Sequence, residues 1–183
     1  MDPIDLSHNI REGNVFIYPT DTLYGLGCDA TNEESVERIK SIKERDRDKP
    51  LSVIAPHIDW IRENFHLDGV DLMEYLPGPY TLLLKKKNLK FLFWISPNDR
   101  IGVRIPNFKF CDCLDVSEGI EMSGRPVVTT SVNLSGEKPA VKISDISKDI
   151  IQKVDFFIKA KNERKLSGKP STLVIDGKEI GRK

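Results

Sequence analysis

The sequence predicts one α/β domain, spanning residues 1–183, with a mixed rather than a purely parallel sheet. Short apolar runs alternate along the chain with amphipathic stretches, and neither internal repeats nor low-complexity segments interrupt them. A length of 183 residues suits one domain of moderate size. Hydrophobic residues make up 39% and charged residues 31% of the chain, so an ordinary buried core can form.

Helices are predicted where apolar residues recur at helical spacing next to capping signals. Gly13 is the expected C-cap of the first helix, and Asn32 or Thr31 the N-cap of the second. The second helix carries acidic residues in its first turn and basic ones in its last, as the helix dipole favours. Ser144 is the expected N-cap of the last helix. In chain order, helices are expected at 4–10, 33–45, 58–65 and 145–153.

Strands are predicted from apolar runs that end in proline, glycine or polar residues. Pro19 and Pro106 each end one run, because proline lacks the N–H that a sheet ladder needs. In chain order, strands are expected at 14–19, 51–55, 81–84, 101–105, 127–131, 155–158 and 171–175.

Two of these strand ends carry dense polar clusters, within 18–24 (YPTDTLY) and 127–136 (VVTTSVNLSG). Ligands of open α/β folds bind at strand ends, so we expect the two clusters to share a site. Hydroxyls and amides suit a substrate that is recognised group by group. The alternative is that these threonines and serines only hydrogen-bond turn backbone.

The candidate cations are Lys43, Arg45 and Arg104. Lys43 and Arg45 stand two apart where a helix is expected to end, so an extended chain would point both the same way. The alternative is that both face water and interact with the helix dipole. Arg104 is flanked by apolar residues on a short strand, which indicates a specific partner such as a carboxylate.

Several site classes are excluded by their missing patterns. The phosphate loop GxxxxGK[ST], the dinucleotide fingerprint GxGxxG and the nucleophile elbow GxSxG are absent. Catalysis by positioning and charge stabilisation on a phosphate-bearing substrate fits the remaining residues. Three cysteines and three dispersed histidines predict neither a disulfide framework nor a protein-bound metal. The chain lacks a membrane-spanning run or signal peptide, so a cytoplasmic location is expected.

Several motifs, taken in order, resemble those of the YrdC-type family, the L-threonylcarbamoyladenylate synthases. The resemblance covers about 14–176 and is specific as a set. It implies the short, single-domain form of the family and a YrdC-like fold, a twisted mixed β-sheet with flanking helices enclosing a deep basic cavity. The motifs are YPTDTLYGLGCDA, KER followed by KPLSV, GPYTLLLKK, VRIP, TTSVNLSG and KPSTLVID.

The resemblance implies that ATP, L-threonine and bicarbonate react to threonylcarbamoyl-AMP and pyrophosphate, with Mg²⁺ accompanying ATP. Downstream machinery would transfer the product to adenosine 37 of tRNA, and tRNA or double-stranded RNA could bind directly. The family signature Lys-x-Arg with Ser-x-Asn falls on Lys43, Arg45, Ser131 and Asn133, which would be catalytic and bind ATP. Other ATP-binding positions are Lys49, Arg100, Pro139 and Arg182, and the threonine-binding positions are Thr22, Arg104, Thr129 and Ser171.

The chain departs from the family pattern at three places. Val132 stands where many relatives have alanine, the loop SGEKPA differs in length by one residue, and the end that carries Arg182 is short. The alternatives are an RNA-binding YrdC-like paralogue and a carbamoyl-transfer accessory protein without synthase activity. A net charge of zero and few stacking aromatics disfavour RNA binding. The intact Lys-x-Arg and Ser-x-Asn set favours the synthase.

Overall fold

A computed structural model describes residues 1–46, 48–110, 112–134 and 136–180. These residues form ten strands in one sheet. The strands are β1 (Phe16–Pro19), β2 (Tyr24–Gly27), β3 (Ser52–Ile54), β4 (Phe65–His66), β5 (Tyr80–Lys86), β6 (Arg100–Arg104), β7 (Val127–Ser131), β8 (Phe156–Phe157), β9 (Thr172–Ile175) and β10 (Lys178–Ile180).

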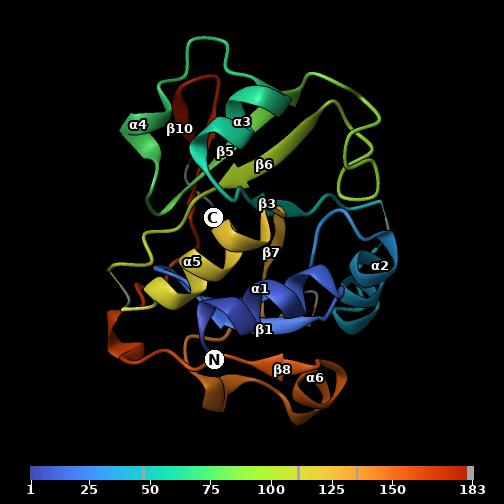
Figure 1. Ribbon diagram of the computed structural model, residues 1–183, viewed down its shortest axis with the longest axis vertical. Helices are drawn as coiled ribbons and strands as arrows, with labels where there is room; N and C mark the ends of the chain where they lie inside the picture. Colours follow the sequence, from blue (N-terminus) through green and yellow to red (C-terminus); the bar gives the residue numbers. More distant parts are fainter. Residues whose placement is uncertain (47, 111, 135, 181–183) are drawn as a thin grey trace.

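The sheet is mixed and twisted (Figure 1). Its strands lie in the order β10-β9-β5-β6-β3-β7-β2-β1-β8, and β4 pairs with β5 outside this path. The pairs β1–β8, β3–β6 and β5–β9 are parallel, and the remaining pairs are antiparallel. The mixed sheet predicted from the sequence is therefore confirmed.

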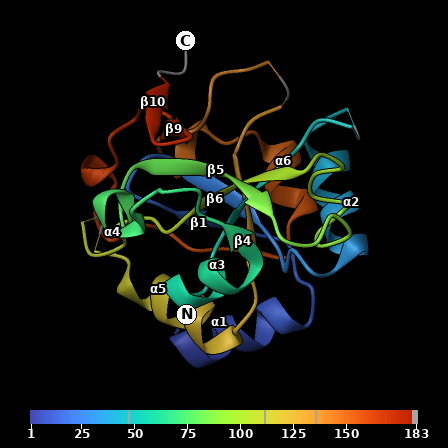
Figure 2. The same ribbon diagram turned by 90° about the horizontal axis from the view of Figure 1, so that it is seen from above.

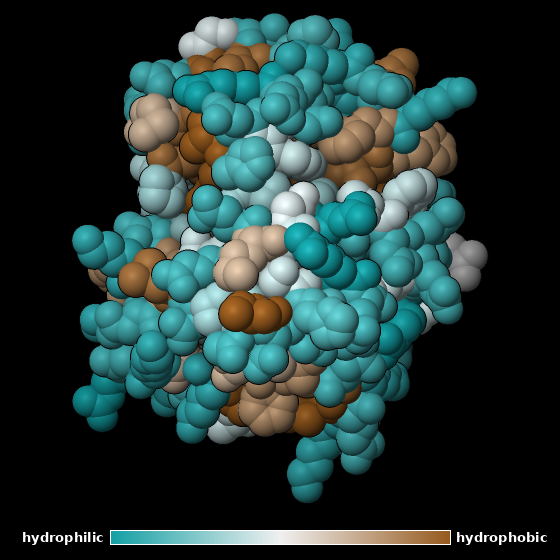
Figure 3. Space-filling view, in the orientation of Figure 1, coloured by the Kyte–Doolittle hydropathy of each residue, from teal (hydrophilic) through white to brown (hydrophobic). Residues whose placement is uncertain are grey.

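Helices cover the sheet, and α1 and α5 lie side by side (Figures 1 and 2). Their bounds are α1 (Pro3–Arg11), α2 (Glu33–Ile42), α3 (Ile58–Asn64), α4 (Leu72–Tyr75), α5 (Leu114–Ser123) and α6 (Lys148–Lys153), with short 3₁₀ turns η1 (Ile143–Asp145) and η2 (Glu163–Lys165). Exposed large apolar side chains include Phe93 and Met73, and hydrophilic residues dominate the face in Figure 3, with a few apolar patches between them.

The predicted N-cap Asn32 is confirmed, Gly13 ends the first helix one position after its C-cap Glu12, and two other predicted helix ends are wrong. Asn32 caps α2 by accepting a hydrogen bond from Ser35 N, and Gly13 follows α1 with φ +80°. The helix expected at 33–45 ends at Ile42, because Glu44 adopts a left-handed φ of +50°. The N-cap of α6 is Ser147, which accepts from Ile150 N, rather than Ser144.

The sequence did not predict β2 or α5, and glycines explain both. A Cβ at Gly27 would lie 2.7 Å from the Tyr18 ring and from Val128 O, so only glycine lets β2 pass between its neighbours. A Cβ at Gly119 would lie 2.8 Å from the Leu6 side chain, so this glycine lets α5 approach α1 closely. Glycine weakens strand and helix propensity, which hides both elements from a pattern analysis.

Candidate active site

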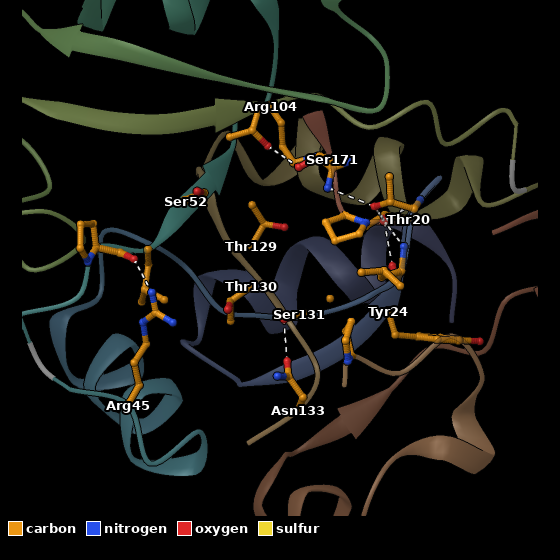
Figure 4. A pocket seen from close by; sticks show the side chains of 18 of the residues that line it. Thr20, Tyr24, Arg45, Ser52, Arg104, Thr129, Thr130, Ser131, Asn133 and Ser171 are labelled. Carbon is orange, nitrogen blue, oxygen red and sulfur yellow. Dashed lines mark hydrogen bonds between the residues drawn. The ribbon is translucent and has the colours of Figure 1, made fainter. Parts of the chain in front are cut away.

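A cavity of about 450 Å³ lies against the sheet where β2, β3, β6 and β7 meet the loops (Figure 4). Hydroxyl side chains dominate its lining. Arg104, Ser171 and Thr20 lie toward one end of the cavity and Arg45 toward the other, with the β7 hydroxyls between. The lining residues are Thr20, Thr22, Leu23, Tyr24, Gly25, Arg45, Pro50, Leu51, Ser52, Thr81, Arg104, Thr129, Thr130, Ser131, Asn133, Glu137, Pro139, Pro170 and Ser171.

The two polar clusters meet here, as predicted, because β2 and β7 pair antiparallel. Gly25 stands opposite Ser131 in the register, so the start of β2 lies beside the end of β7. Four residues join β1 to β2, and Thr20 organises this turn. Its Oγ1 donates to Leu23 O at 2.7 Å and accepts from the backbone N–H groups of Thr22 and Leu23. Thr20 thus orders the turn as well as lining the cavity, and its hydroxyl lies 2.9 Å from that of Thr22, which also lines the cavity.

Arg104 reaches the cavity from the end of β6 and is almost fully buried. Its Nη2 donates to Asp21 Oδ1 at 2.7 Å, and its Nη1 donates to Thr22 Oγ1 at 3.3 Å. Asp21 Oδ2 accepts from Asn107 N at 2.9 Å. The carboxylate partner expected for Arg104 is thus present within the chain. The buried Arg104 Nε has no hydrogen-bond partner among the described residues.

Lys43 is buried behind the lining rather than in it. Its Nζ donates to the backbone oxygens of Ser131 and Asn133, the latter at 2.8 Å, and to Asn133 Oδ1 at 3.2 Å. Burial, and then the nearby charge of Arg45, lower the pKa of Lys43 from 10.5 to about 8. Lys43 therefore remains mostly protonated at neutral pH and holds the chain at the end of β7.

The expectation that an extended chain aligns Lys43 with Arg45 is wrong, because the chain turns at Glu44. Arg45 nevertheless lines the cavity. Its Nη2 donates to Pro50 O at 2.9 Å, and its Nε donates to Lys49 O at 3.4 Å. Burial lowers the pKa of Arg45, which still leaves a guanidinium cation at any physiological pH. Its remaining N–H groups are available to an anion.

Ser131 and Asn133 form the wall next to Lys43. Ser131 Oγ donates to Asn133 Oδ1 at 2.6 Å, and Asn133 Nδ2 donates to the backbone oxygens of Leu134 and Glu137. Pro139 lines the cavity beyond this loop. The Ser-x-Asn pair predicted from the sequence is thus one hydrogen-bonded unit, anchored from behind by Lys43.

Thr129 and Ser171 also lie where the sequence placed them, in the lining. Ser171 Oγ is 2.7 Å from the Thr81 hydroxyl, so one of the two hydroxyls donates a hydrogen bond to the other. The prediction missed Thr81 and Ser52. Both residues are cross-strand neighbours of predicted site residues. Thr81 lies next to Arg104 across β5 and β6, and Ser52 pairs with Thr129 across β3 and β7, so the strand register would have indicated them.

Two of the expected nucleotide contacts, Lys49 and Arg100, lie outside this lining. Lys49 is exposed and outside the lining, contributing only its backbone oxygen to Arg45. Arg100 forms an ion pair with Asp176 at 2.8 Å. It lines a neighbouring cavity of about 360 Å³ that shares Pro50–Ser52 with the first. Arg182 lies outside the described residues.

The deep basic cavity that the family resemblance implies is not found among the described residues. Arg45, Arg104 and Glu137 are the charged side chains of the described lining, and Asp21 neutralises Arg104. Tyr24 contributes no charge either, since burial raises the pKa of its phenol. The described residues contain no metal-binding group of three or more histidine, cysteine or acidic side chains. In the same part of the chain, no helix has the length and apolar character needed to cross a membrane.

Comparisons with known proteins identify the family of the chain. The Sua5_yciO_yrdC family model, described as "Telomere recombination", matches residues 8–181. The threonylcarbamoyl-AMP synthase of Pseudomonas fluorescens is 36% identical over 140 residues, covering 74% of this chain and 72% of that protein. The synthase of Marinobacter nauticus is 31% identical over 156 residues, covering 81% and 78%.

A similar fold is found in a solved structure, Sua5 of P. abyssi complexed with L-threonine. The TM-score is 0.80 at 27% identity, over 94% of this chain and 50% of that one. The chain thus spans about half of that Sua5 and about three quarters of the two bacterial synthases. The match over nearly its whole length shows that the chain belongs to the Sua5/YciO/YrdC family.

Proposed function

We propose that this protein is an L-threonylcarbamoyladenylate synthase. The observation that carries the proposal is a hydroxyl-lined cavity with a guanidinium toward each end, Arg104 and Arg45, in a member of this family. Two synthases more than 30% identical to the chain support it. So does the P. abyssi Sua5 structure, which holds L-threonine.

The two ends of the cavity suit the two organic substrates. Threonine would lie at the end of Arg104, with Thr22, Thr129 and Ser171 available to its polar groups. Its α-carboxylate does not react and stays negative throughout, so a fixed guanidinium is an apt partner. ATP would extend toward Arg45, Ser131 and Asn133, with Pro139 beside it and Arg100 in the adjoining cavity.

The reaction would proceed in two steps, carbamate formation and then adenylation. The neutral amine of threonine and bicarbonate form a carbamate and release water. A carbamate oxygen then attacks the α-phosphorus of ATP, and the bond to the bridging oxygen breaks as pyrophosphate leaves. Arg45 would stabilise the charge on the phosphates, and Lys43 would hold Ser131 and Asn133 in place from behind.

Mg²⁺ would enter as part of the substrate MgATP. Glu137 is the carboxylate of the described lining, and Asp21 is already engaged by Arg104 and Asn107. The ion would therefore be held mainly by phosphate oxygens and water, and would neutralise the departing pyrophosphate. We further propose a cytoplasmic location and a downstream protein that transfers the threonylcarbamoyl group to tRNA.

The test is threonine-dependent release of pyrophosphate. The purified protein is incubated with ATP, Mg²⁺, bicarbonate and L-threonine, and pyrophosphate and the mass of threonylcarbamoyl-AMP are measured. Omission of threonine or of bicarbonate should each abolish both signals. Equal pyrophosphate release without threonine contradicts the proposal. Salt-sensitive RNA binding with neither substrate bound would instead favour the RNA-binding alternative.

A further inference from the structure

The ion pair between Asp21 and Arg104 occupies an unusual place in the site. Asp21 is buried, yet it is not among the residues that line the cavity, so it stands behind Arg104. Both of its oxygens are used, Oδ1 by Arg104 Nη2 and Oδ2 by Asn107 N. The turn around it is further fixed, since Ser167 N donates to Asp21 O at 3.1 Å.

This arrangement leaves Arg104 incompletely satisfied. The guanidinium has five N–H donors, and the described residues accept only from Nη1 and Nη2. Nε is buried without a partner, at a cost that an ion pair alone would not require. Asp21 holds the guanidinium in one orientation, with Nη1 at the Thr22 hydroxyl that lines the cavity.

We infer that Asp21 is a positioning residue for amino-acid recognition, and that it acts by fixing the Arg104 guanidinium to receive the α-carboxylate of threonine. This inference rests on the proposed synthase function. A pre-oriented guanidinium loses less freedom when the carboxylate binds, so the benefit appears as affinity for the amino acid. Asp21 itself does not touch the substrate.

A simpler role for Asp21 predicts the opposite result. If Asp21 only neutralised Arg104, removing its charge would leave the guanidinium more strongly positive. Threonine would then bind more tightly, because its carboxylate would no longer compete with a built-in one. If Asp21 positions Arg104, threonine binds more weakly despite the gain in positive charge. The direction of the change in affinity separates the two roles.

The experiment measures threonine binding to the full chain by calorimetry, together with KM and kcat for both substrates. In Asp21→Asn we expect a rise of about tenfold or more in Kd and KM for threonine, the loss expected for one charged hydrogen bond. The KM for ATP should stay within about twofold, because Arg45 and Asn133 are untouched. Tighter or unchanged threonine binding overturns the inference.

Two further variants keep the test decisive if Asp21→Asn folds poorly. Asp21→Glu retains the charge but lengthens the side chain by one methylene, so it should displace the guanidinium and weaken threonine binding while the fold persists. Asp155→Asn is the matched control, since Asp155 also accepts from an arginine, Arg38 at 2.9 Å, and from a backbone N–H, that of Val15 at 2.7 Å. It lies outside the cavity lining and should leave threonine binding unchanged.

A double variant identifies Arg104 as the route of the effect. If Asp21 acts through Arg104, then Asp21→Asn should add little to the loss already caused by Arg104→Lys, whose ammonium cannot be oriented as a fork. Fully additive losses in threonine Kd overturn the inference. The wild-type protein separates this outcome from the proposed function. If it binds threonine but makes no threonylcarbamoyl-AMP, the synthase proposal fails while the Asp21 effect on binding can still be measured.

Discussion

Replacement of Lys43 by methionine tests whether the buried ammonium serves the site or only the fold. Methionine has similar length and fills the space, but the carbonyl oxygens of Ser131 and Asn133 lose their donor. An unsatisfied buried carbonyl costs about 1–3 kcal/mol. Against this, the substitution removes a buried charge whose pKa is lowered from 10.5 to about 8, a penalty of about 3 kcal/mol.

The two terms largely cancel, so Lys43→Met should lose at most about 3 kcal/mol of stability, or less than about 10 °C in Tm. Activity should fall far more. Ser131 and Asn133 would lose the anchor that fixes the wall of the cavity, together with a positive charge behind it. We expect threonine-dependent pyrophosphate release to drop about a hundredfold, equivalent to about 3 kcal/mol of transition-state stabilisation.

Lys86→Met is the matched control. Lys86 is equally buried, and its Nζ donates to two backbone oxygens, those of Leu89 and Ser96, each at 3.0 Å. It does not line the cavity. This variant should lose comparable stability and keep its activity. If Lys43→Met melts near the wild-type temperature and retains activity within about twofold, Lys43 has no role in the site and our reasoning is wrong.

Four further predictions concern the same cavity. Arg45→Ala should melt almost as the wild type, since its contact to Pro50 O is at the surface, yet lose activity about a hundredfold, with Arg45→Lys recovering only part. kcat/KM should fall as pH rises through about 8, where Lys43 loses its proton, and Lys43→Arg should flatten this decline. Because the folded state lowers this pKa, the unfolded state binds more protons between about pH 8 and 10.5. The stability of the wild type relative to Lys43→Met should therefore rise across that window in melting experiments. Ser171→Ala, which removes the partner of the Thr81 hydroxyl, should raise the KM for threonine about tenfold and leave that for ATP nearly unchanged.

The sequence predicted most strands because their signals are local. Pro19 ends β1, and seven apolar runs fall on β1, β3, β5, β6, β7, β8 and β9. What it missed depends on tertiary contacts. The sequence pattern of Gly25 and Gly27 indicates a turn, although both belong to β2. These strand positions are glycine because the Tyr18 ring leaves no room for a side chain. The end of α2 was misplaced because the sequence of charged residues from Lys43 onward continues a helical pattern that the left-handed Glu44 interrupts.

The same distinction applies to the site. Thr22, Thr129, Ser131 and Asn133 could be predicted, since hydroxyls and amides at strand ends already form a recognisable pattern. The different positions and roles of Lys43 and Arg45 could not be predicted. Two cations two positions apart look equivalent in a sequence, and only the folded chain shows that one is buried against backbone oxygens while the other lines the cavity.

The charges of the cavity explain how one site could bind both substrates, each at its own end. At the amino-acid end, Asp21 balances Arg104, so the end is close to neutral and selects by the direction of its hydrogen bonds. At the other end, the described residues that accept from Arg45 do so through backbone oxygens, and Lys43 behind the wall donates to oxygens of Ser131 and Asn133, while Glu137 is the carboxylate in the lining. The end proposed for the triphosphate therefore has two cations, Arg45 and Lys43, that form no ion pair within the described part of the chain. A polyanion gains most there, whereas a zwitterionic amino acid gains more from the oriented, neutral pair.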